Sequence, residues 1–527
     1  MKKTKIWISI SLLLGLFLRI FLINQNPPSL NWDEVSHGFN AYSILKTGRD
    51  EWGNIMPLIF RCFGDFKLPL YIYLTVPSIL FFGLNPFSVR LVSVIAGTLT
   101  PLIIYLILKK LIPSKKFIPF LGFLITLLSP GTVFLSRIAL EANLFMFLFC
   151  LSLYFLISQK FGWSTFIFGL SLFSYNSSRV LLPFYLAALF YFISKEKINF
   201  KKIFSQFIPF IILAGLAVYQ TFNQSGQARY QWVSLLDSGS INQINELRQT
   251  YPRFLVNKAT YFTFTAIKNY LSHFNPQFIF FNGGSHYQFS LPHFYIISPL
   301  LIPFFLLGLI YLIKNIRQLP YKLILFWLII SPIPSSITRD APHILRSITF
   351  IPIIIIIISL GISYSLNKFT RLNLLYISAA LILGQIFFWP KYFQYSKQYS
   401  SSWQYGYQQA ISYIKDNYQN YDQIIFTKKY GEPHEFILFY WPWNPASYQN
   451  DPQKNWDYHA NWYWVNAFNK FQFVNDWEIK QFTQNISLNQ KVLLITSPNN
   501  YNQDRTSLLK SVNFLDQTAA FDILEIK

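Results

Sequence analysis

Cysteine and charge are both scarce in this 527-residue sequence. It has two cysteines, Cys62 and Cys150, and only 13% of its residues are charged. Cys150 lies in an apolar run and Cys62 in a polar loop, so the two do not form a disulfide framework. The charged share is about half that of a soluble domain, while 52% of residues are hydrophobic and the mean hydropathy is +0.30. These proportions indicate a polytopic membrane protein.

Acidic residues are the scarcest charged type, with 22 Asp and Glu against 44 Lys and Arg and a net charge of +22. Such a surplus is also typical of nucleic-acid-binding proteins. Residues 392–527, however, carry 11 basic and 12 acidic side chains, so the surplus belongs to the hydrophobic portion. This distribution argues against nucleic acid as a partner. The sequence also has no glycine-rich phosphate loop, serine hydrolase elbow or dinucleotide fingerprint, which argues against nucleotide-dependent chemistry.

Apolar runs dominate the first 390 residues, and twelve of them are long enough to cross, or nearly cross, a bilayer. The first run follows a lysine-rich N-terminus without a small-residue cleavage site, so it is interpreted as an uncleaved span. The runs lie near residues 6–23, 68–84, 89–108, 117–135, 138–158, 161–176, 180–194, 203–220, 294–313, 321–334, 344–366 and 373–390.

The distribution of charge predicts the topology. The N-terminus and five connections between runs contain 17 Lys and Arg and one acid, Glu196, and cytoplasmic loops are enriched in such basic residues. All six segments are cytoplasmic only if the short, proline-containing run 68–84 does not cross but lies at the outer interface. The prediction is therefore about eleven transmembrane helices plus one interfacial helix, with a cytoplasmic N-terminus. Loops 24–88 and 221–293 and the tail 392–527 are then extracytoplasmic.

The tail is expected to form a small α/β domain, separate from a transmembrane domain of residues 1–391. Residues 402–416 have helical periodicity, whereas 423–426, 492–495 and 521–526 are typical of strands. The aromatic stretch 439–443 could bind sugar faces or the membrane interface, and packing in the core is the more ordinary interpretation.

The first outer loop contains the candidate catalytic residues. Asp33 and Glu34 are adjacent, about ten residues after the first span, where burial and like charge would raise a carboxylate pKa and favour a general base. A solvated loop or a helix-start acid pair explains the same residues equally well. Later in this loop, Lys67 could bind a phosphate as a point charge or extend along the membrane surface.

Further ionisable residues lie at predicted span ends. Glu141 is about one turn into an apolar run and four residues after Arg137, a spacing that permits an ion pair in a functional or a purely structural role. A turn before the run 344–366 contains His343 and Arg346, and an arginine fork suits a phosphate. Arg19, Arg90 and Arg179 are interpreted as interfacial anchors.

Metal binding has weak support in the sequence. Asp33 and His37 would share a helix face, and His286 and His293 lie in another outer loop, but neither spacing is a defined metal motif. We therefore expect no cofactor and no required metal.

The order of these motifs resembles the membrane-embedded GT-C glycosyltransferases of the protein O-mannosyltransferase and aminoarabinose transferase kind. The resemblance spans roughly residues 1–365. The motifs that carry it are, in order, Trp32-Asp33-Glu34, Lys67-Leu68-Pro69-Leu70-Tyr71, Arg90-Leu91-Val92-Ser93 with Gly97, and Ser136-Arg137 with Glu141. The mannosyltransferase pattern His-Pro-Pro-Leu is replaced by Lys67-Leu68-Pro69-Leu70, which leaves the donor sugar open. The tail lacks the Trp-Trp-Asp signature of oligosaccharyltransferases, which argues against transfer of a preassembled oligosaccharide to asparagine.

The resemblance implies a hexosyl- or pentosyltransferase that moves a sugar from a polyprenyl-phosphate carrier to a protein, lipid or glycan acceptor on the external face, usually with inversion. It also implies Asp33 as base or acceptor-orienting residue beside Glu34. Lys67, Arg137 and Arg346 would hold the donor phosphate, with Glu141 and His343 in support. A flippase or transporter of lipid-linked sugars is the alternative, since it would also need many spans and a few intramembrane charges. A binding module on a membrane anchor is a third interpretation, although eleven spans exceed what anchoring requires.

Overall fold

The computed structural model describes residues 2–115, 117–196, 198, 203–223, 232–365, 370–460, 462–484, 486 and 490–527. Contacts divide the chain into two compact units, each built from two separate segments. The first unit comprises Met1–Phe21 and Ser93–Pro390, and the second comprises Leu22–Val92 and Lys391–Lys527. The division into a transmembrane domain of residues 1–391 and a separate tail domain remains a prediction. The contacts instead group the first outer loop with the tail.

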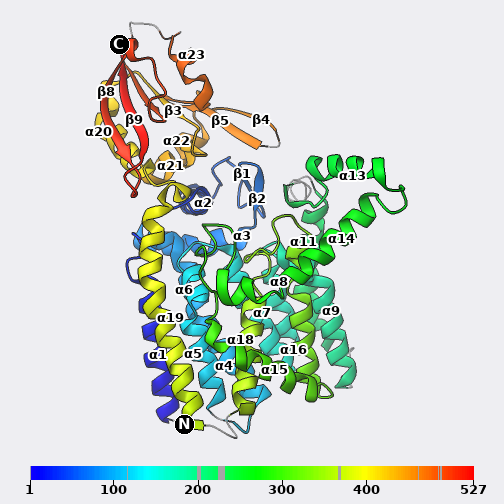
Figure 1. Cartoon of the computed structure of the whole chain (residues 1–527). Coiled ribbons are helices and arrows are strands. Elements are labelled where there is room, and N and C mark those ends of the chain that lie inside the picture. Colours follow the sequence, from blue (N-terminus) through cyan, green and yellow to red (C-terminus); the bar gives the residue numbers. More distant parts are fainter. Residues whose placement is uncertain are drawn as a thin grey trace. The chain divides into compact units, whose positions relative to one another are not determined.

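The first unit is helical, and Figure 1 shows its long helices running side by side, with α1 (blue) next to α19 (yellow). Helices α4 and α19 each have one end in the second unit. The elements are α1 (Lys2–Ile20), α4 (Pro86–Leu111), α5 (Ile118–Leu128), α6 (Pro130–Ser136), α7 (Glu141–Ile157), α8 (Phe161–Ser171), α9 (Ser177–Lys195), η1 (Phe204–Phe207), α11 (Ile208–Phe222), α13 (Ser238–Thr250), α14 (Lys258–Ser272), η2 (Gln277–Asn282), η3 (Pro299–Leu301), α15 (Ile302–Lys314), α16 (Leu319–Ile330), α17 (Ile333–Ser336), α18 (Phe350–Ser365) and α19 (Thr370–Gln398).

Several of these helices are suited to a bilayer. Among the described residues, five helices are long and apolar enough to cross a membrane, or six if the bent pair α5 and α6 forms one span. Four apolar helices are shorter, including α18, in which a run of isoleucines is buried. These features support a membrane protein. The number of eleven spans and the orientation of the termini remain predictions.

Close packing of α15 against α18 depends on two glycines. A Cβ atom at Gly361 would lie 1.8 Å from the carbonyl oxygen of Phe304, and one at Gly308 would lie 1.9 Å from that of Ile357. Only glycine allows two backbones to approach so closely, as is common between helices in membranes.

The second unit combines short helices with two sheets. Its helices are α2 (Trp32–Thr47), α3 (Pro69–Phe82), η4 (Ser400–Trp403), α20 (Tyr407–Asn417), η5 (Tyr418–Asn420), α21 (Pro433–Tyr440), α22 (Pro445–Gln449), η6 (Asp476–Glu478), α23 (Ile479–Gln484) and η7 (Gln503–Arg505). Its strands are β1 (Phe60–Cys62), β2 (Asp65–Lys67), β3 (Gln423–Thr427), β4 (Asn455–His459), β5 (Trp462–Phe468), β6 (Phe471–Val474), β7 (Val492–Thr496), β8 (Thr506–Asn513) and β9 (Ala519–Ile526).

Seven of these strands form one mixed sheet in the order β4-β5-β6-β3-β7-β9-β8. Strand β3 pairs in parallel with β6 and β7, and the other pairs are antiparallel. The central strands β3 and β7 are almost wholly buried, which their uninterrupted apolar sequences explain. The strands predicted at 423–426, 492–495 and 521–526 are confirmed.

Helix α3 covers most of the run 68–84, which was predicted to lie at the outer membrane interface. It has 14 residues, or about 21 Å at 1.5 Å per residue, which is shorter than the roughly 30 Å hydrocarbon core of a bilayer. Its placement at the membrane interface remains a prediction. The aromatic stretch 439–443 packs in the unit: Phe439 is 2% exposed, and Trp441 and Trp443 contact the ring of Phe471.

Candidate functional site

Helix α2 begins at the acidic pair predicted from the sequence. Asn31 is the N-cap, and its side chain accepts a hydrogen bond from the Glu34 backbone N–H at 2.9 Å. The Glu34 carboxylate accepts one from the Asn31 backbone N–H at 3.2 Å, which completes a capping box. Asp33 and Glu34 both lie in the first turn, where a negative charge is favoured by the helix dipole. The helix-start interpretation therefore accounts for Glu34.

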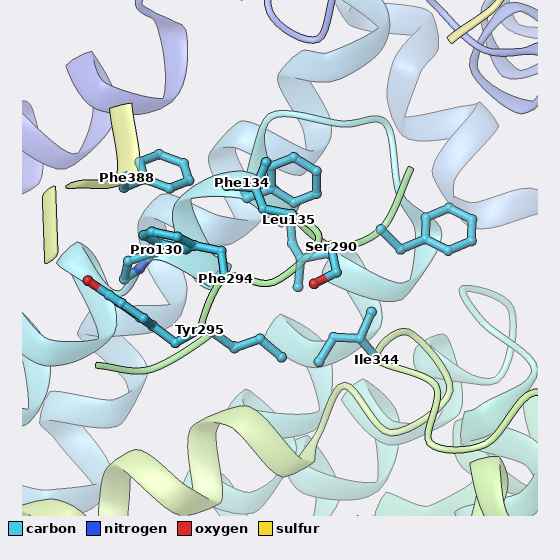
Figure 2. Close-up of a pocket in the computed structure, with 12 residues that line it drawn as sticks. Pro130, Phe134, Leu135, Ser290, Phe294, Tyr295, Ile344 and Phe388 are labelled. Carbon is cyan, nitrogen blue, oxygen red and sulfur yellow. The ribbon is translucent and has the colours of Figure 1, made fainter. Parts of the chain in front are cut away.

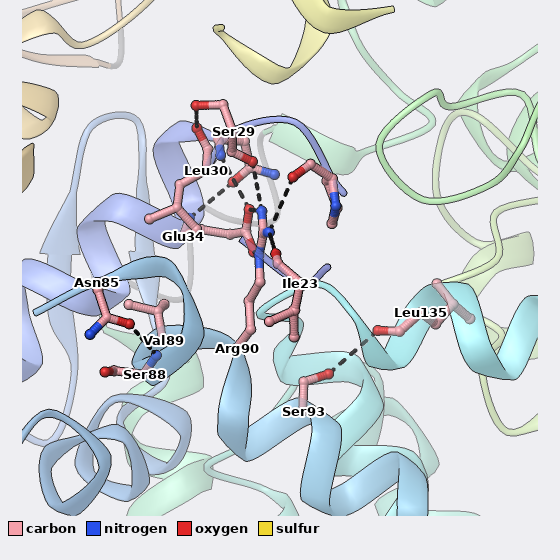
Figure 3. Close-up of polar contacts among 12 residues, drawn as sticks. Ile23, Ser29, Leu30, Glu34, Asn85, Ser88, Val89, Arg90, Ser93 and Leu135 are labelled. Atoms are coloured by element: carbon pink, nitrogen blue, oxygen red, sulfur yellow. Dashed lines mark hydrogen bonds and ion pairs between the residues drawn. The ribbon is translucent and has the colours of Figure 1, made fainter. Parts of the chain in front are cut away.

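Glu34 also forms a buried ion pair with Arg90 near the start of α4. The guanidinium donates to both carboxylate oxygens, at 2.9 and 3.0 Å, and both side chains are at most 1% exposed. Figure 3 shows the remaining donors directed at backbone carbonyls of the segment between α1 and α2, among them those of Ile23 and Ser29. Arg90 also donates to the Pro27 carbonyl. The interpretation of Arg90 as an interfacial anchor is wrong, because the side chain holds this segment and the start of α2 in place.

Asp33 points to a different partner. Its carboxylate accepts a hydrogen bond from Lys67 Nζ at 2.5 Å, and its side chain is 31% exposed, compared with 11% for Lys67. Lys67 ends strand β2, which pairs with β1 in a short hairpin, and α3 begins two residues later. The structure thus brings together the carboxylate predicted as base and the lysine predicted to bind phosphate.

Aromatic rings flank this pair in the sequence and pack together in the structure. Trp32, directly before Asp33, lies with its ring centroid 5.8 Å from Phe63 and 6.1 Å from Trp462, and Phe63 and Trp462 are stacked at 5.6 Å. The Trp462 indole N–H donates to the Glu432 carboxylate. Burial raises the pKa of Glu432 to about 7 despite this hydrogen bond. Sequence reasoning did not identify this cluster, because its members come from three separate segments.

Arg137 makes backbone contacts in the first unit. Its guanidinium donates to the carbonyls of Leu18, Arg19 and Phe21 at 2.8, 3.2 and 2.6 Å and lies over the ring of Trp389. These bonds go to carbonyls at and just beyond the end of α1, where a helix no longer supplies partners of its own. Glu141 is the first residue of α7, so it begins the helix instead of lying one turn inside it. The predicted Arg137–Glu141 pair remains a prediction.

Arg346 lies at a pocket of about 180 Å³ in the same unit, together with Arg179. Arg346 donates to Thr338 Oγ1 at 3.0 Å and to the Arg339 carbonyl, and its own N–H donates to His343 Nδ1 at 3.4 Å. It precedes α18 by four residues, so it lies in the turn and not inside the helix. Arg179 donates to Gln220 at 2.7 Å. Two arginines therefore line one pocket, where the sequence indicated only Arg346.

A second pocket of the first unit is almost wholly apolar. Figure 2 shows it between the start of α6 and a segment following η2. It is lined by Pro130, Gly131, Phe134, Leu135, Phe289, Ser290, Leu291, Phe294, Tyr295, Ile296, Ile344 and Phe388. Its volume of about 10 Å³ is roughly that needed for one water molecule, so it is a gap in the packing and not a ligand site.

The described residues contain one group of acidic and histidine side chains close enough to share a metal ion, Glu51, His434 and Glu435. It includes none of the pairs considered from the sequence, which were Asp33 with His37 and His286 with His293. Burial raises the pKa of Glu51 to about 7 and that of Glu435 well above its usual value.

Comparisons with known proteins agree with the resemblance noted in the sequence. Residues 9–193, roughly a third of the chain, match the family described as dolichyl-phosphate-mannose-protein mannosyltransferase. A comparison with curated sequences gave no significant match. The chain is similar to ArnT from Cupriavidus metallidurans bound to undecaprenyl phosphate, with 11% identity and a TM-score of 0.53 over 98% of each chain. Apo ArnT from the same organism gives 11% identity and a TM-score of 0.52 over 99% of this chain and 98% of that one.

A third solved structure is the archaeal oligosaccharyltransferase AglB from Archaeoglobus fulgidus, in complex with an inhibitory peptide and a dolichol-phosphate. It is 13% identical, with a TM-score of 0.49 over 82% of this chain, which spans 63% of the length of AglB. The match to the mannosyltransferase family and the near-complete overlap with ArnT confirm the predicted resemblance: the chain has the fold of the GT-C glycosyltransferases.

Proposed function

We propose that this protein transfers a single sugar from a polyprenyl-phosphate carrier to a protein, lipid or glycan acceptor at the external face of the membrane. The observation that carries the proposal is the partly exposed pair of Asp33 and Lys67, held at the start of α2 by the buried Glu34–Arg90 pair. The shared fold with ArnT, whose structure contains undecaprenyl phosphate, supports a carrier of this class.

In the proposed mechanism, Asp33 removes the proton from the acceptor hydroxyl or amine as that group attacks the anomeric carbon. Attack opposite the phosphate inverts the configuration and releases polyprenyl phosphate. The developing charge on the phosphate needs cations, and a general base of this kind contributes about 10²- to 10⁴-fold to the rate. Lys67 neutralises Asp33 before the donor binds; when it turns to the phosphate, the carboxylate becomes available as a base.

The single experiment that tests this function uses purified full-length protein and a synthetic polyprenyl-phosphate sugar. We expect release of free polyprenyl phosphate that depends on an added acceptor and is slow with water alone. Transport of the intact lipid between leaflets of proteoliposomes, without cleavage under any acceptor, would instead establish the flippase alternative.

Arg346 is proposed to bind the donor phosphate, with Arg179 at the same pocket and His343 in support. Arg137 is the other proposed phosphate ligand, and Glu141 supports it.

Replacing Arg346 by lysine keeps the charge but removes the planar fork, so the donor should bind roughly tenfold more weakly. The measurement is the KM for the donor, and Arg339→Lys is the control, because Arg339 is 43% exposed and pairs with Asp340. Equal KM values for both variants would contradict this role.

The orientation is proposed from the charge distribution, with the N-terminus cytoplasmic and residues 392–527 extracytoplasmic. Both native cysteines are buried, so a single introduced cysteine can be labelled against a low background. We expect a membrane-impermeant maleimide to label Asp516→Cys in intact cells and Ser114→Cys only after permeabilisation. Labelling of Ser114→Cys in intact cells would overturn the orientation.

A further inference from the structure

Three ionisable side chains meet in the interior of the second unit, away from the Asp33–Lys67 pair. Glu51 lies in the loop that follows α2, and His434 and Glu435 lie in the first turn of α21. The side chains are only 1%, 3% and 1% exposed, and one ligand atom of each lies within 4.8 Å of the other two. Small torsional adjustments would bring these atoms to the distances of roughly 2.0–2.2 Å at which carboxylates and imidazoles bind metals.

Two buried carboxylate oxygens of this group, Glu51 Oε2 and Glu435 Oε2, accept no hydrogen bond from an N–H or hydroxyl group of the described residues. His434 Nδ1 makes no hydrogen bond there either, although the Glu432 carboxylate lies beside it. The other oxygen of Glu51 accepts a hydrogen bond from Asn40 at 3.0 Å, so the carboxylate is oriented with one oxygen held and one unsatisfied. Buried polar atoms are rarely left without a partner, so two unsatisfied carboxylate oxygens beside a buried histidine indicate that a cation or a proton completes the group.

The surroundings add negative charge. Glu432 places a third carboxylate beside the group, with its Oε2 3.4 Å from His434 Nδ1. Lys454 lies nearby, but its ammonium donates to the Glu51 backbone carbonyl at 3.2 Å and lies over the Tyr448 ring. Two carboxylates this close in a desolvated interior are stable only if a proton or a cation neutralises them.

The geometry points to a divalent cation site formed by Glu51, His434 and Glu435. One imidazole with two carboxylates suits Zn²⁺ or Mn²⁺ better than the harder Mg²⁺ or Ca²⁺, which prefer oxygen alone. The ion would have a structural role, because its ligands are fully buried and it would join the loop before strand β1 to helix α21. This inference is independent of the proposed transferase activity.

The test measures metal content and stability, not catalysis. Full-length protein is purified in detergent, stripped with EDTA, incubated with excess Zn²⁺ or Mn²⁺, desalted and measured by mass spectrometry of the metals. We expect about one ion per chain for the unmodified protein. Glu435→Gln and Glu51→Gln keep the side-chain shape but remove ligand charge, so each should bind at least tenfold more weakly. His459→Gln is the matched control, because His459 is exposed and bonded to Asp457.

Thermal unfolding separates the cation from a shared proton. Added Zn²⁺ or Mn²⁺ should raise the unfolding midpoint of the unmodified protein and of His459→Gln but not of Glu435→Gln, since only a native site couples binding to folding. Unmodified protein that stays metal-free in excess of both ions, while Glu435→Gln raises the unfolding midpoint, would show that a proton joins the two carboxyls and would overturn the site.

Discussion

Replacing Asp33 by asparagine is expected to reduce sugar transfer on the order of 100-fold or more while leaving the protein folded. Asparagine has the same shape and can still accept a hydrogen bond from Lys67, but it cannot take a proton from the acceptor. The Asp33 side chain is 31% exposed and the asparagine oxygen still accepts from Lys67, so we expect the protein to fold although Lys67 loses its countercharge. The rate of polyprenyl phosphate release under saturating donor and acceptor measures the effect.

Two further variants separate a catalytic loss from a structural one. Asp237→Asn is the control, because Asp237 is also an N-terminal helix carboxylate, capping α13, and asparagine caps equally well. Glu34→Gln should lower the yield of folded protein instead of the turnover of each molecule, since Glu34 is bonded to Arg90. Near-normal turnover by Asp33→Asn would move the role of base to another carboxylate.

Arg90→Met is expected to destabilise the second unit by about 3–5 kcal/mol, which is the usual cost of removing one member of a buried ion pair and leaving the other charge uncompensated. The change leaves Glu34 charged and buried, and it removes donors from the carbonyls of Ile23, Pro27 and Ser29. The loss of stability is measured as the midpoint of thermal unfolding in detergent, with resistance to protease as the signal for folded protein.

The control for this prediction is Arg248→Met on the exposed surface of α13, where a substitution should change stability by no more than about 0.5 kcal/mol. Arg90→Lys should fall between the two, since lysine restores the charge but cannot donate to both carboxylate oxygens and to the backbone carbonyls at once. An unfolding midpoint for Arg90→Met equal to that of the control would refute the anchoring role.

The sequence was most informative where one local pattern determines the structure. Strands β3 and β7 contain uninterrupted apolar runs, β9 is mostly apolar apart from Asp522 and Glu525, and the adjacent acids after Asn31 are typical of a helix start. The order of motifs suggested Asp33 as a base and Lys67 as a phosphate ligand in one site, and the two side chains are paired in the structure. The fold resemblance was likewise visible, because the motifs occur in a fixed order.

The remaining contacts depend on residues that are distant in sequence. Glu34 and Arg90 are separated by 56 positions, and nothing local distinguishes Arg90 from an arginine at a membrane interface. Strands β4 and β5 are rich in Trp, Tyr and Asn, and an exposed hairpin of this kind lacks the alternation that identifies a half-buried strand. The group of Glu51, His434 and Glu435 has no metal-motif spacing, since Glu51 comes from a different segment.

The division of the second unit between two distant segments also constrains the order of synthesis. Its first segment ends at Val92 and its second begins at Lys391, with roughly 300 residues between them. At about 5–20 residues per second, translation of the intervening helices takes roughly 15–60 s. During that time the Gly38 side of α2 lacks the Phe439 ring that packs on it, and Glu51 lacks its α21 neighbours. The segment carrying Asp33 must therefore remain soluble in an incomplete state until the second segment has been made.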